Sequence, residues 1–212
     1  MMSIDAMRRV FRHAPLTELD PNPLKQFGHW FDEAKDSAPV DWLEVNAMTL
    51  CTHGLDGFPQ SRIVLLKGIS EQGLQFFTNY QSHKGLELAA DPRASLNFYW
   101  PHLARQVRVQ GLVTKLPRSD SEAYFASRPR GSQLGAWASH QSEPISDASV
   151  LERQLAEAEA RFGDTVPCPP HWGGYVLVPS LMEFWAGREN RLHHRVRYQR
   201  TDNKWQLQWL QP

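Results

Sequence analysis

Short apolar segments alternate with turn residues between positions 47 and 116, and the spacing leaves room there for only one short helix. Residues 47–53 and 60–67 have the pattern of two strands, and Asp56-Gly57 between them is typical of a hairpin turn. Parallel neighbours would need crossover helices, which this spacing does not provide. The pattern therefore predicts a mainly β fold, an antiparallel sheet or barrel with helices added around it. Further strands are expected over 74–78, 95–100, 106–116, 174–178, 182–185, 195–199 and 205–210.

Helices are expected beside this β core. One begins at Pro23, because the apolar residues after it recur at helical spacing and proline suits a first helical turn. A short helix is expected over 82–90. Another begins at the capping-box pattern of residues 119–122 and continues to about Arg128. The last covers 147–162 and has an apolar stripe, typical of a buried face, made of Leu151, Leu155, Ala158 and Phe162.

Charge and composition exclude several classes of protein. The 212 residues include 23 Lys and Arg and 23 Asp and Glu, so we expect no bulk attraction to nucleic acid or to an anionic membrane. Asp5, Arg8 and Arg9 stand where a signal peptide would need apolar residues, and the apolar runs are too short to span a membrane. Only two cysteines are present, which fits a reducing compartment. We therefore expect a cytoplasmic protein.

The common phosphate-loop, nucleophile-elbow and paired-histidine motifs are absent from the sequence. The best metal candidates are Cys168, His171, His193 and His194, but their spacing is poor for zinc. We expect no metal site.

Two cations bracket the apolar run between Arg62 and Lys67. A separation of five residues directs them to opposite faces of a regular strand, about 16 Å apart along the backbone. They can then serve two different anions, one on each side of the sheet. Two solvated strand ends remain the alternative.

Gln81-Ser82-His83-Lys84 places a hydroxyl, backbone N–H groups and a cation at an expected helix start, which favours an anion. A solvated helix start is the alternative.

Tyr124 and Arg128 are four residues apart, so one helix face would present both to a ligand. Ser132 follows after a turn. Arginine and hydroxyl donors are what a phosphate monoester needs, although a surface arginine beside a helix end is the alternative.

Arg191, His193 and Arg195 share one face if residues 191–195 form an extended strand. Such a row can face an anionic, aromatic ligand, or it can be a solvated edge strand. Trp185 offers a ring for a flat cofactor, or it belongs to the core.

Taken in order, these segments resemble the pyridoxine (pyridoxamine) 5′-phosphate oxidase family. The resemblance covers nearly the whole chain beyond about Pro23, and the combination of its pieces is more specific than any one of them. The matching stretches are RIVLLK (62–67), FFTN (76–79), SHKG (82–85), ARQVRVQG (104–111), YFASRPRGSQLGAWAS (124–139), QS (141–142) and EFWAGRENRLHHR (183–195).

The resemblance implies an FMN-binding split β-barrel and a homodimer with FMN at the subunit interface. It implies an N-terminal lid over 1–22 and an FMN-binding domain over 23–212, whose strands from about 170 to 212 serve dimerisation and substrate binding. FMN contacts are implied for Arg62, His83, Lys84, Gln141 and Ser142, the last two from the partner chain. The flavin would be lined by Ile63, Val64, Leu65, Leu66, Lys67, Phe77, Thr78, Gln106, Trp185 and Arg195.

The same resemblance implies that Lys67, Tyr124, Arg128 and Ser132 hold a substrate phosphate, while Arg191 and His193 cover the substrate ring as catalytic residues. The implied reaction oxidises a small phosphorylated pyridine, pyridoxamine or pyridoxine 5′-phosphate, to pyridoxal 5′-phosphate with molecular oxygen, and releases hydrogen peroxide.

Some residues depart from the family pattern. Phe77 and Phe11 stand where tyrosine is usual, and His83 replaces the usual arginine. Two other functions therefore stay open: oxidation of a different cyclic substrate by a phenazine-type relative, and binding of flavin or pyridoxal phosphate without catalysis.

Overall fold

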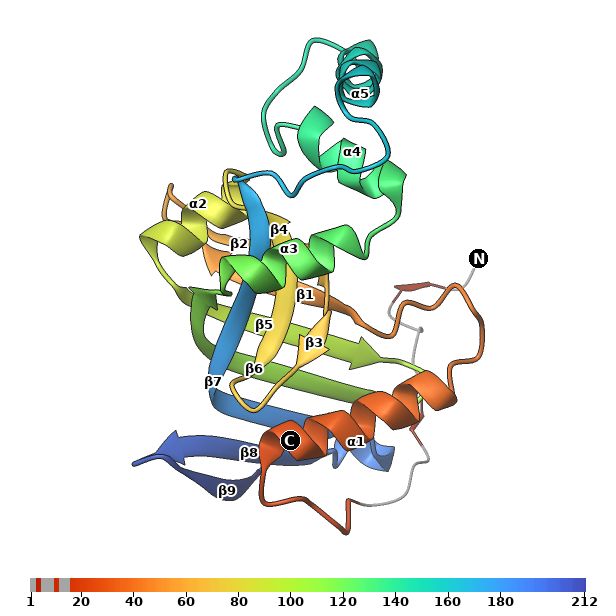
Figure 1. Cartoon of the computed structure of the whole chain (residues 1–212). Coiled ribbons are helices and arrows are strands. Elements are labelled where there is room, and N and C mark those ends of the chain that lie inside the picture. The colour runs from red at the N-terminus through yellow and green to blue at the C-terminus, as the bar shows by residue number, and fades with distance from the viewer. Residues whose placement is uncertain (1–2, 5–9, 12–15) are drawn as a thin grey trace.

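The computed structural model describes residues 3–4, 10–11 and 16–212 (Figure 1). Its strands are β1 (Ala47–His53), β2 (Pro59–Leu65), β3 (Gly68–Ile69), β4 (Leu74–Asn79), β5 (Arg93–Trp100), β6 (Arg105–Lys115), β7 (Trp172–Ala186), β8 (His194–Thr201) and β9 (Lys204–Leu210). The helices are α1 (Pro23–Asp36), α2 (His83–Ala90), α3 (Arg118–Ala126), α4 (Arg130–Ala138) and α5 (Ser149–Arg161), with a 3-10 turn over Glu189–Arg191.

The strands form one antiparallel sheet in the order β2-β1-β5-β6-β7-β4-β3, with β8 and β9 added beside β7. The two ends of this order curve toward each other, because the Lys67 N–H after β2 donates to the Gln75 carbonyl in β4 at 2.8 Å. The result is a partly open barrel with flanking helices, which confirms the predicted split-barrel fold class.

Apolar side chains at alternate positions along the strands fill the barrel interior. Leu50, Leu96, Val107 and Leu177 come from four strands and are almost completely buried. Helix α1 packs against the same core, with the Trp30 and Phe184 ring centroids 5.1 Å apart. Its start is as predicted, with Pro23 in the first turn.

The helices after β6 differ from the predicted ones. Helix α3 begins at Arg118 after Pro117, with no side-chain cap, so the predicted capping box is wrong. It ends at Ala126, two residues before Arg128, because Pro129 disfavours helical geometry in the residue before it. Helix α4 was not predicted at all.

Helix α5 follows the predicted range closely, but its apolar stripe is only partly buried. Ala158 packs in a small second cluster with Phe125, Leu134 and Trp172. Leu151 and Leu155, two members of the predicted stripe, are exposed in this chain.

Two strand predictions are corrected at the C-terminal end. Residues 174–178 and 182–185 were expected to form separate strands, but both belong to one strand, β7. The pairing of β7 with β6 shifts register between Gln110 and Gly111. The extended strand expected over 191–195 is also wrong. Asn190 and Arg191 have φ values of 56° and 61°, which form a turn, and β8 begins only at His194.

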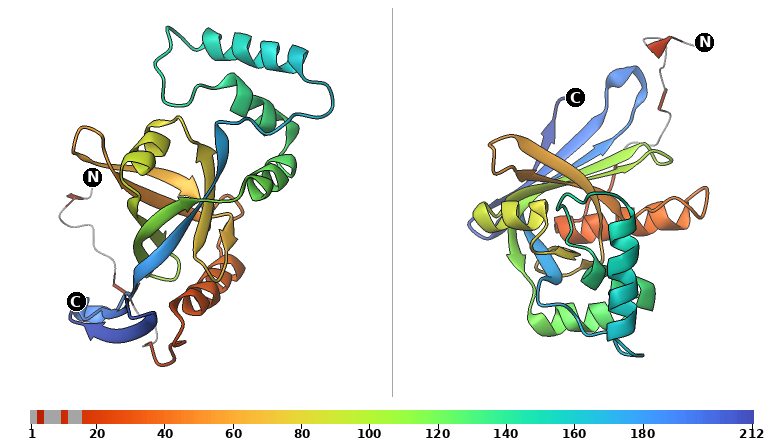
Figure 2. Two further views of the ribbon diagram at one scale, coloured as in Figure 1. Left: turned by 60° about the vertical axis from the view of Figure 1, so that its left-hand side comes forward. Right: turned by 90° about the horizontal axis from the view of Figure 1, so that it is seen from above.

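Helices α4 and α5 lie at the opposite end of the molecule from the β8–β9 hairpin, as both rotated views show (Figure 2). In the part of the chain that the structure describes, no helix is long and apolar enough to cross a membrane. The predicted lid over 1–22 is described only in part, and Arg8 and Arg9 lie outside the described residues.

Candidate functional site

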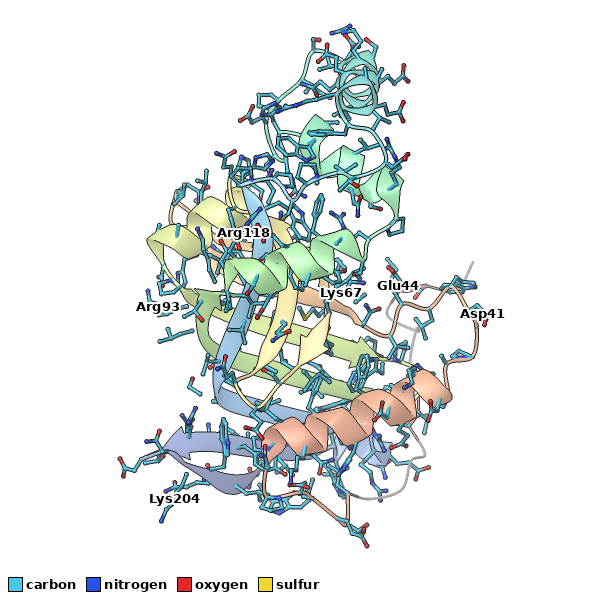
Figure 3. All side chains as sticks on the ribbon, viewed as in Figure 1. Asp41, Glu44, Lys67, Arg93, Arg118 and Lys204 are labelled. Atoms are coloured by element: carbon cyan, nitrogen blue, oxygen red, sulfur yellow. The ribbon has the colours of Figure 1, made fainter. Side chains whose placement is uncertain are left out.

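A cavity of about 630 Å³ lies among β2, β4, the start of α2 and the α3–α4 segment. We call it the α3 cavity. Figure 3 shows Lys67 below the C-terminal end of α3 and Arg118 at the other end of that helix. The predicted site residues that line the α3 cavity are Ile63, Val64, Leu65, Lys67, Phe77, Thr78, Lys84, Tyr124, Arg128, Ser132 and Gln141.

Lys67 reaches the cavity because β2 ends at Leu65. The Leu66 N–H donates to the Asn46 carbonyl and the Lys67 N–H to the Gln75 carbonyl, both at 2.8 Å. These bonds turn the chain out of β2, so the regular strand expected through Lys67 is wrong. Leu66 itself is buried in the barrel core rather than in the cavity wall.

Arg62 does not line the α3 cavity. Its Nη2 atom lies 2.7 Å from Glu87 Oε2, and its Nη1 donates to the Thr52 hydroxyl. The Thr52 hydroxyl in turn donates to Glu87 Oε2 at 2.5 Å. Arg62 is thus held beneath α2 by a buried carboxylate.

Lys84 is buried at the start of α2, where its Nζ donates to the Ser82 hydroxyl at 3.1 Å. Burial and the charge of Arg62 lower the pKa of the Lys84 ammonium, and the charge of Glu87 acts in the opposite direction. Arg62 and Lys84 thus lie near one carboxylate, and of these two only Arg62 forms an ion pair with it. The excess positive charge favours an anion in the adjacent cavity.

Arg128 lies over an aromatic wall of the cavity. Its guanidinium carbon is 4.7 Å from the Trp172 ring centroid. The Phe77 and Tyr124 rings are stacked with centroids 4.0 Å apart, and Trp172 lies nearly parallel to both. Arg128 Nη1 is buried and has no hydrogen-bond acceptor among the described residues. Tyr124 and Arg128 thus meet in one cavity, although they do not share a helix face.

Gln141 and Ser142 were expected to come from the partner chain. Here they reach the cavity region of their own chain. The Thr78 hydroxyl donates to Gln141 Oε1 at 3.3 Å, and the His83 N–H donates to the Ser142 hydroxyl at 3.3 Å. The His83 side chain is exposed and does not line the cavity.

A second group of predicted residues lies on β6, β7 and β8. Gln106 pairs with Trp185, and Trp185 pairs with Arg195, so the three are neighbours across the sheet. Arg195 donates from Nε and Nη2 to Glu183 Oε1, at 3.0 and 2.9 Å. These residues form one surface, although none of them lines the α3 cavity.

His193 packs on this second group, with its ring centroid 4.7 Å from that of Trp185. Its Nδ1 accepts the Arg188 N–H at 3.0 Å. Burial, and secondly the charge of Arg191, lower the pKa of the His193 imidazole. Phe11 also contacts His193 and Trp185 by its ring, so this departure from the family pattern lies at the site.

The two groups are far apart within one chain. Trp172 in the cavity and Trp185 in the second group are near opposite ends of β7. At about 3.3 Å per residue they are separated by roughly 40 Å of strand. One small ligand cannot contact both groups of the same chain.

Several cavity residues were missed by sequence reasoning. Trp172 is the most notable, and Asn79, Pro129, Gly135, Ala136 and Ser139 are the others. Trp172 follows Pro169-Pro170 and begins a predicted strand region, so its only signal was an aromatic residue at a strand start. The described residues contain no group of three or more potential metal ligands.

Comparison with known proteins identifies this architecture. Residues 26–162 match the family model described as pyridoxamine 5′-phosphate oxidase. Residues 172–212 match the model described as the pyridoxine 5′-phosphate oxidase C-terminal dimerisation region. Two curated relatives, both named as pyridoxine/pyridoxamine 5′-phosphate oxidases, come from Ralstonia nicotianae and Nocardioides. They are 54% and 53% identical, and the alignments cover all of this chain and at least 99% of each relative.

Solved structures agree with this assignment. PhzG from Burkholderia lata 383, in complex with tetrahydrophenazine-1-carboxylic acid, is 35% identical, with a TM-score of 0.85 over 91% of this chain and 94% of that one. A pyridoxamine 5′-phosphate oxidase-related, FMN-binding protein from Nostoc punctiforme shares the fold at 18% identity, with a TM-score of 0.72 over 92% of this chain and all of that one. Together with the fold and the cavity, these matches show that the chain belongs to the pyridoxamine 5′-phosphate oxidase family.

Proposed function

We propose that the protein oxidises pyridoxamine 5′-phosphate, pyridoxine 5′-phosphate or both to pyridoxal 5′-phosphate, with FMN as cofactor and molecular oxygen as final acceptor. Hydrogen peroxide would be released, with ammonia from the amine. The single observation that most supports this function is the set of unpaired cations around the α3 cavity.

Lys67, Lys84 and Arg128 line the cavity, and none of them forms an ion pair with a carboxylate of the described residues. Lys84 is buried and Arg128 has a buried, unpartnered Nη1 atom, so these two charges are costly without an anion, whereas Lys67 is exposed. Tyr124 and Ser132 add hydroxyl donors on the α3–α4 side. The chemistry fits two phosphates, one near Lys84 and one near Arg128.

The residues present fit FMN. Lys84 and the start of α2, with Arg62 behind them, supply the positive charge that a phosphate monoester needs. Gln106, Trp185 and Arg195 supply amide, ring and guanidinium groups on the second surface. FMN, when bound, would accept hydride from the 4′ carbon of the substrate and transfer the electrons to oxygen.

The remaining task of the protein is orientation. Lys67, Tyr124, Arg128 and Ser132 would hold the substrate phosphate, so that the pyridine ring has a defined position. Because His193 Nδ1 accepts the Arg188 N–H, the neutral ring holds its proton on Nε2, where it would donate a hydrogen bond to the substrate. Arg191 would stabilise negative charge on the ring substituents.

A homodimer would bring the two groups of residues together. The α3 cavity of one subunit would face the Trp185 and Arg195 surface of the other, since they are too far apart in one chain. The match of residues 172–212 to a dimerisation region supports this arrangement.

A second candidate is oxidation of another cyclic substrate. The similarity to PhzG, whose structure contains a tetrahydrophenazine carboxylic acid, favours it. The cations around the α3 cavity favour a phosphorylated substrate instead, because a carboxylate ligand would leave most of these donors unpartnered.

The test is turnover by purified protein loaded with FMN. We expect hydrogen peroxide to form with pyridoxamine 5′-phosphate and very little to form with pyridoxamine. Arg128→Ala should remove this preference, whereas Arg153→Ala, on the exposed face of α5, should retain it. Binding without peroxide would support a non-catalytic binding protein. Neither binding nor turnover would support the phenazine-type alternative.

A further inference from the structure

We propose that Trp172 is the positioning residue for substrate phosphate, because its indole holds the Arg128 guanidinium in the α3 cavity. This inference rests on the proposed function for the identity of the phosphate ligand. It assigns a role to a residue that lies outside the sequence motifs of the family resemblance.

The contact is well defined. The Arg128 guanidinium carbon lies 4.7 Å from the Trp172 ring centroid and 5.5 Å from that of Phe125. Trp172 is 6% exposed, and Phe125 packs edge-on against it at 5.1 Å. Phe125 therefore restricts the indole ring of Trp172, and the Arg128 guanidinium lies over a ring whose position is fixed.

The indole is itself held in place by backbone contacts. Arg118 Nη1 donates to the Trp172 carbonyl at 3.0 Å, and the Trp172 N–H donates to the Pro169 carbonyl at 3.1 Å. Trp172 also pairs with Asn79 at the end of β4. The backbone of Trp172 is thus fixed by β4, by α3 and by the loop before β7, and its ring packs in the apolar cluster with Phe125 and Leu134.

Other arginines of the predicted site are held differently. Arg62 is fixed by Glu87 and Arg195 by Glu183, through hydrogen bonds that occupy part of each guanidinium. Arg128 is not paired with any described carboxylate, and its buried Nη1 has no acceptor.

An aromatic anchor has a specific advantage at this position. A guanidinium stacked on a ring keeps its in-plane N–H donors available for a bidentate phosphate contact. A carboxylate anchor would use these donors and would repel the dianion. Trp172 thus orients Arg128 without reducing its positive charge or its hydrogen-bonding capacity.

The experiment is a double-mutant cycle on the FMN-loaded protein, with Trp172→Leu, Arg128→Ala and the double variant. The measured quantities are the KM for pyridoxamine 5′-phosphate and the Kd of pyridoxal 5′-phosphate by calorimetry. In Trp172→Leu the loss of the cation–π contact should raise both the KM and the Kd by about tenfold. In the Arg128→Ala background the same substitution should have little further effect, because both act through one contact. Trp172→Phe should recover most of the affinity.

Trp137→Leu is the matched control. Trp137 belongs to the same apolar cluster and has Arg161 5.0 Å over its ring, but it does not line the α3 cavity. It should lower stability without changing the Kd. Independent, multiplicative losses in the cycle would overturn the proposal, as would no loss in Trp172→Leu. A wild-type protein that binds pyridoxal 5′-phosphate with the expected coupling, but does not turn over, would contradict the proposed function alone.

Discussion

Glu183 on β7 lies diagonally across from Arg195 on β8, and the Glu183 Oε1 atom accepts hydrogen bonds from both Nε and Nη2 of Arg195. The other carboxylate oxygen lies 3.6 Å from Arg108 Nη1. Glu183 is nearly buried, whereas Arg108 is about half exposed. One buried carboxylate thus holds two arginines on the surface that also contains Trp185.

Removal of this carboxylate should destabilise the protein. In Glu183→Gln the Arg195 guanidinium loses its charged partner, although partial exposure lets water replace some of the interaction. We expect the free energy of unfolding in urea to fall by about 1–3 kcal/mol. Asp91→Asn, which removes a surface pair with Arg93, is the control and should change little. Unchanged stability of Glu183→Gln would show that the pair contributes nothing.

Substitution of Arg62 should reduce retention of the cofactor, whereas substitution of Arg191 should reduce turnover. Arg62→Ala removes a cation beside Lys84 and leaves Glu87 buried without its partner, so FMN should dissociate more readily. The ratio of flavin to protein absorbance after gel filtration measures this loss.

Arg191 is exposed and lies in a turn, away from the α3 cavity. Arg191→Ala should therefore keep its FMN while kcat falls at least about tenfold, since one charge-stabilising donor is lost. Equal loss of flavin in both variants would contradict the assignment of the two arginines to different ligands.

Local patterns predicted the barrel well. In β1, β5 and β6, buried residues alternate with more exposed ones along the chain. A period of two residues indicates a strand and no other regular structure. Helix α4 was missed because RGSQLGAWA contains two glycines and follows a proline, a composition that is also typical of a loop.

The turn at Asn190 and Arg191 shows a different limit. The alternation of Arg191, His193 and Arg195 is the same in a strand and in a turn that leads into one. Only the positive φ values distinguish them, and neither residue is a glycine that would have indicated such a turn. The row of three side chains on one strand face was therefore a reasonable but wrong prediction.

The partition of the site could not be predicted from spacing. Trp172 and Trp185 belong to one strand, and nothing in their separation indicates that they serve different surfaces. The resemblance to a family predicted which residues form the site. The structure was needed to show that they lie in two separate groups.

The protonation of His193 should depend on Arg191. Burial and the Arg191 charge both disfavour the imidazolium, so the pKa of His193 lies below its ordinary value of 6.5 and the ring is neutral at pH 7. Arg191→Gln removes one of these causes and should raise the pKa. As the pH falls through this pKa, Nδ1 gains a proton and can no longer accept the Arg188 N–H.

Titration of the His193 ring signals by NMR measures this shift. His140→Gln, which removes another histidine outside the second group, assists assignment and should leave the His193 titration unchanged. An identical His193 pKa in wild type and Arg191→Gln would mean that the charge of Arg191 is screened by solvent.

Complementation between variants tests the shared site directly. Arg128→Ala and Arg195→Ala damage the two groups that lie near opposite ends of β7, so each homodimer should have two defective sites and low activity. In a mixed dimer, one site would contain both substitutions and the other neither. Random mixing makes half of the dimers mixed, so activity should recover to about a quarter of the wild-type value.

The mixture is prepared by co-expression of the two variants with different tags, and the mixed dimers are isolated by sequential affinity steps. Purified mixed dimers should then reach about half of the wild-type turnover per dimer, since one of two sites is intact. Mixing Arg128→Ala with Lys67→Ala is the control, because both residues line the same cavity and each site of the mixed dimer keeps one defect. No recovery in the first pair would mean that each site is built within a single chain. Recovery in the control would mean that Lys67 and Arg128 do not serve one site from the same chain.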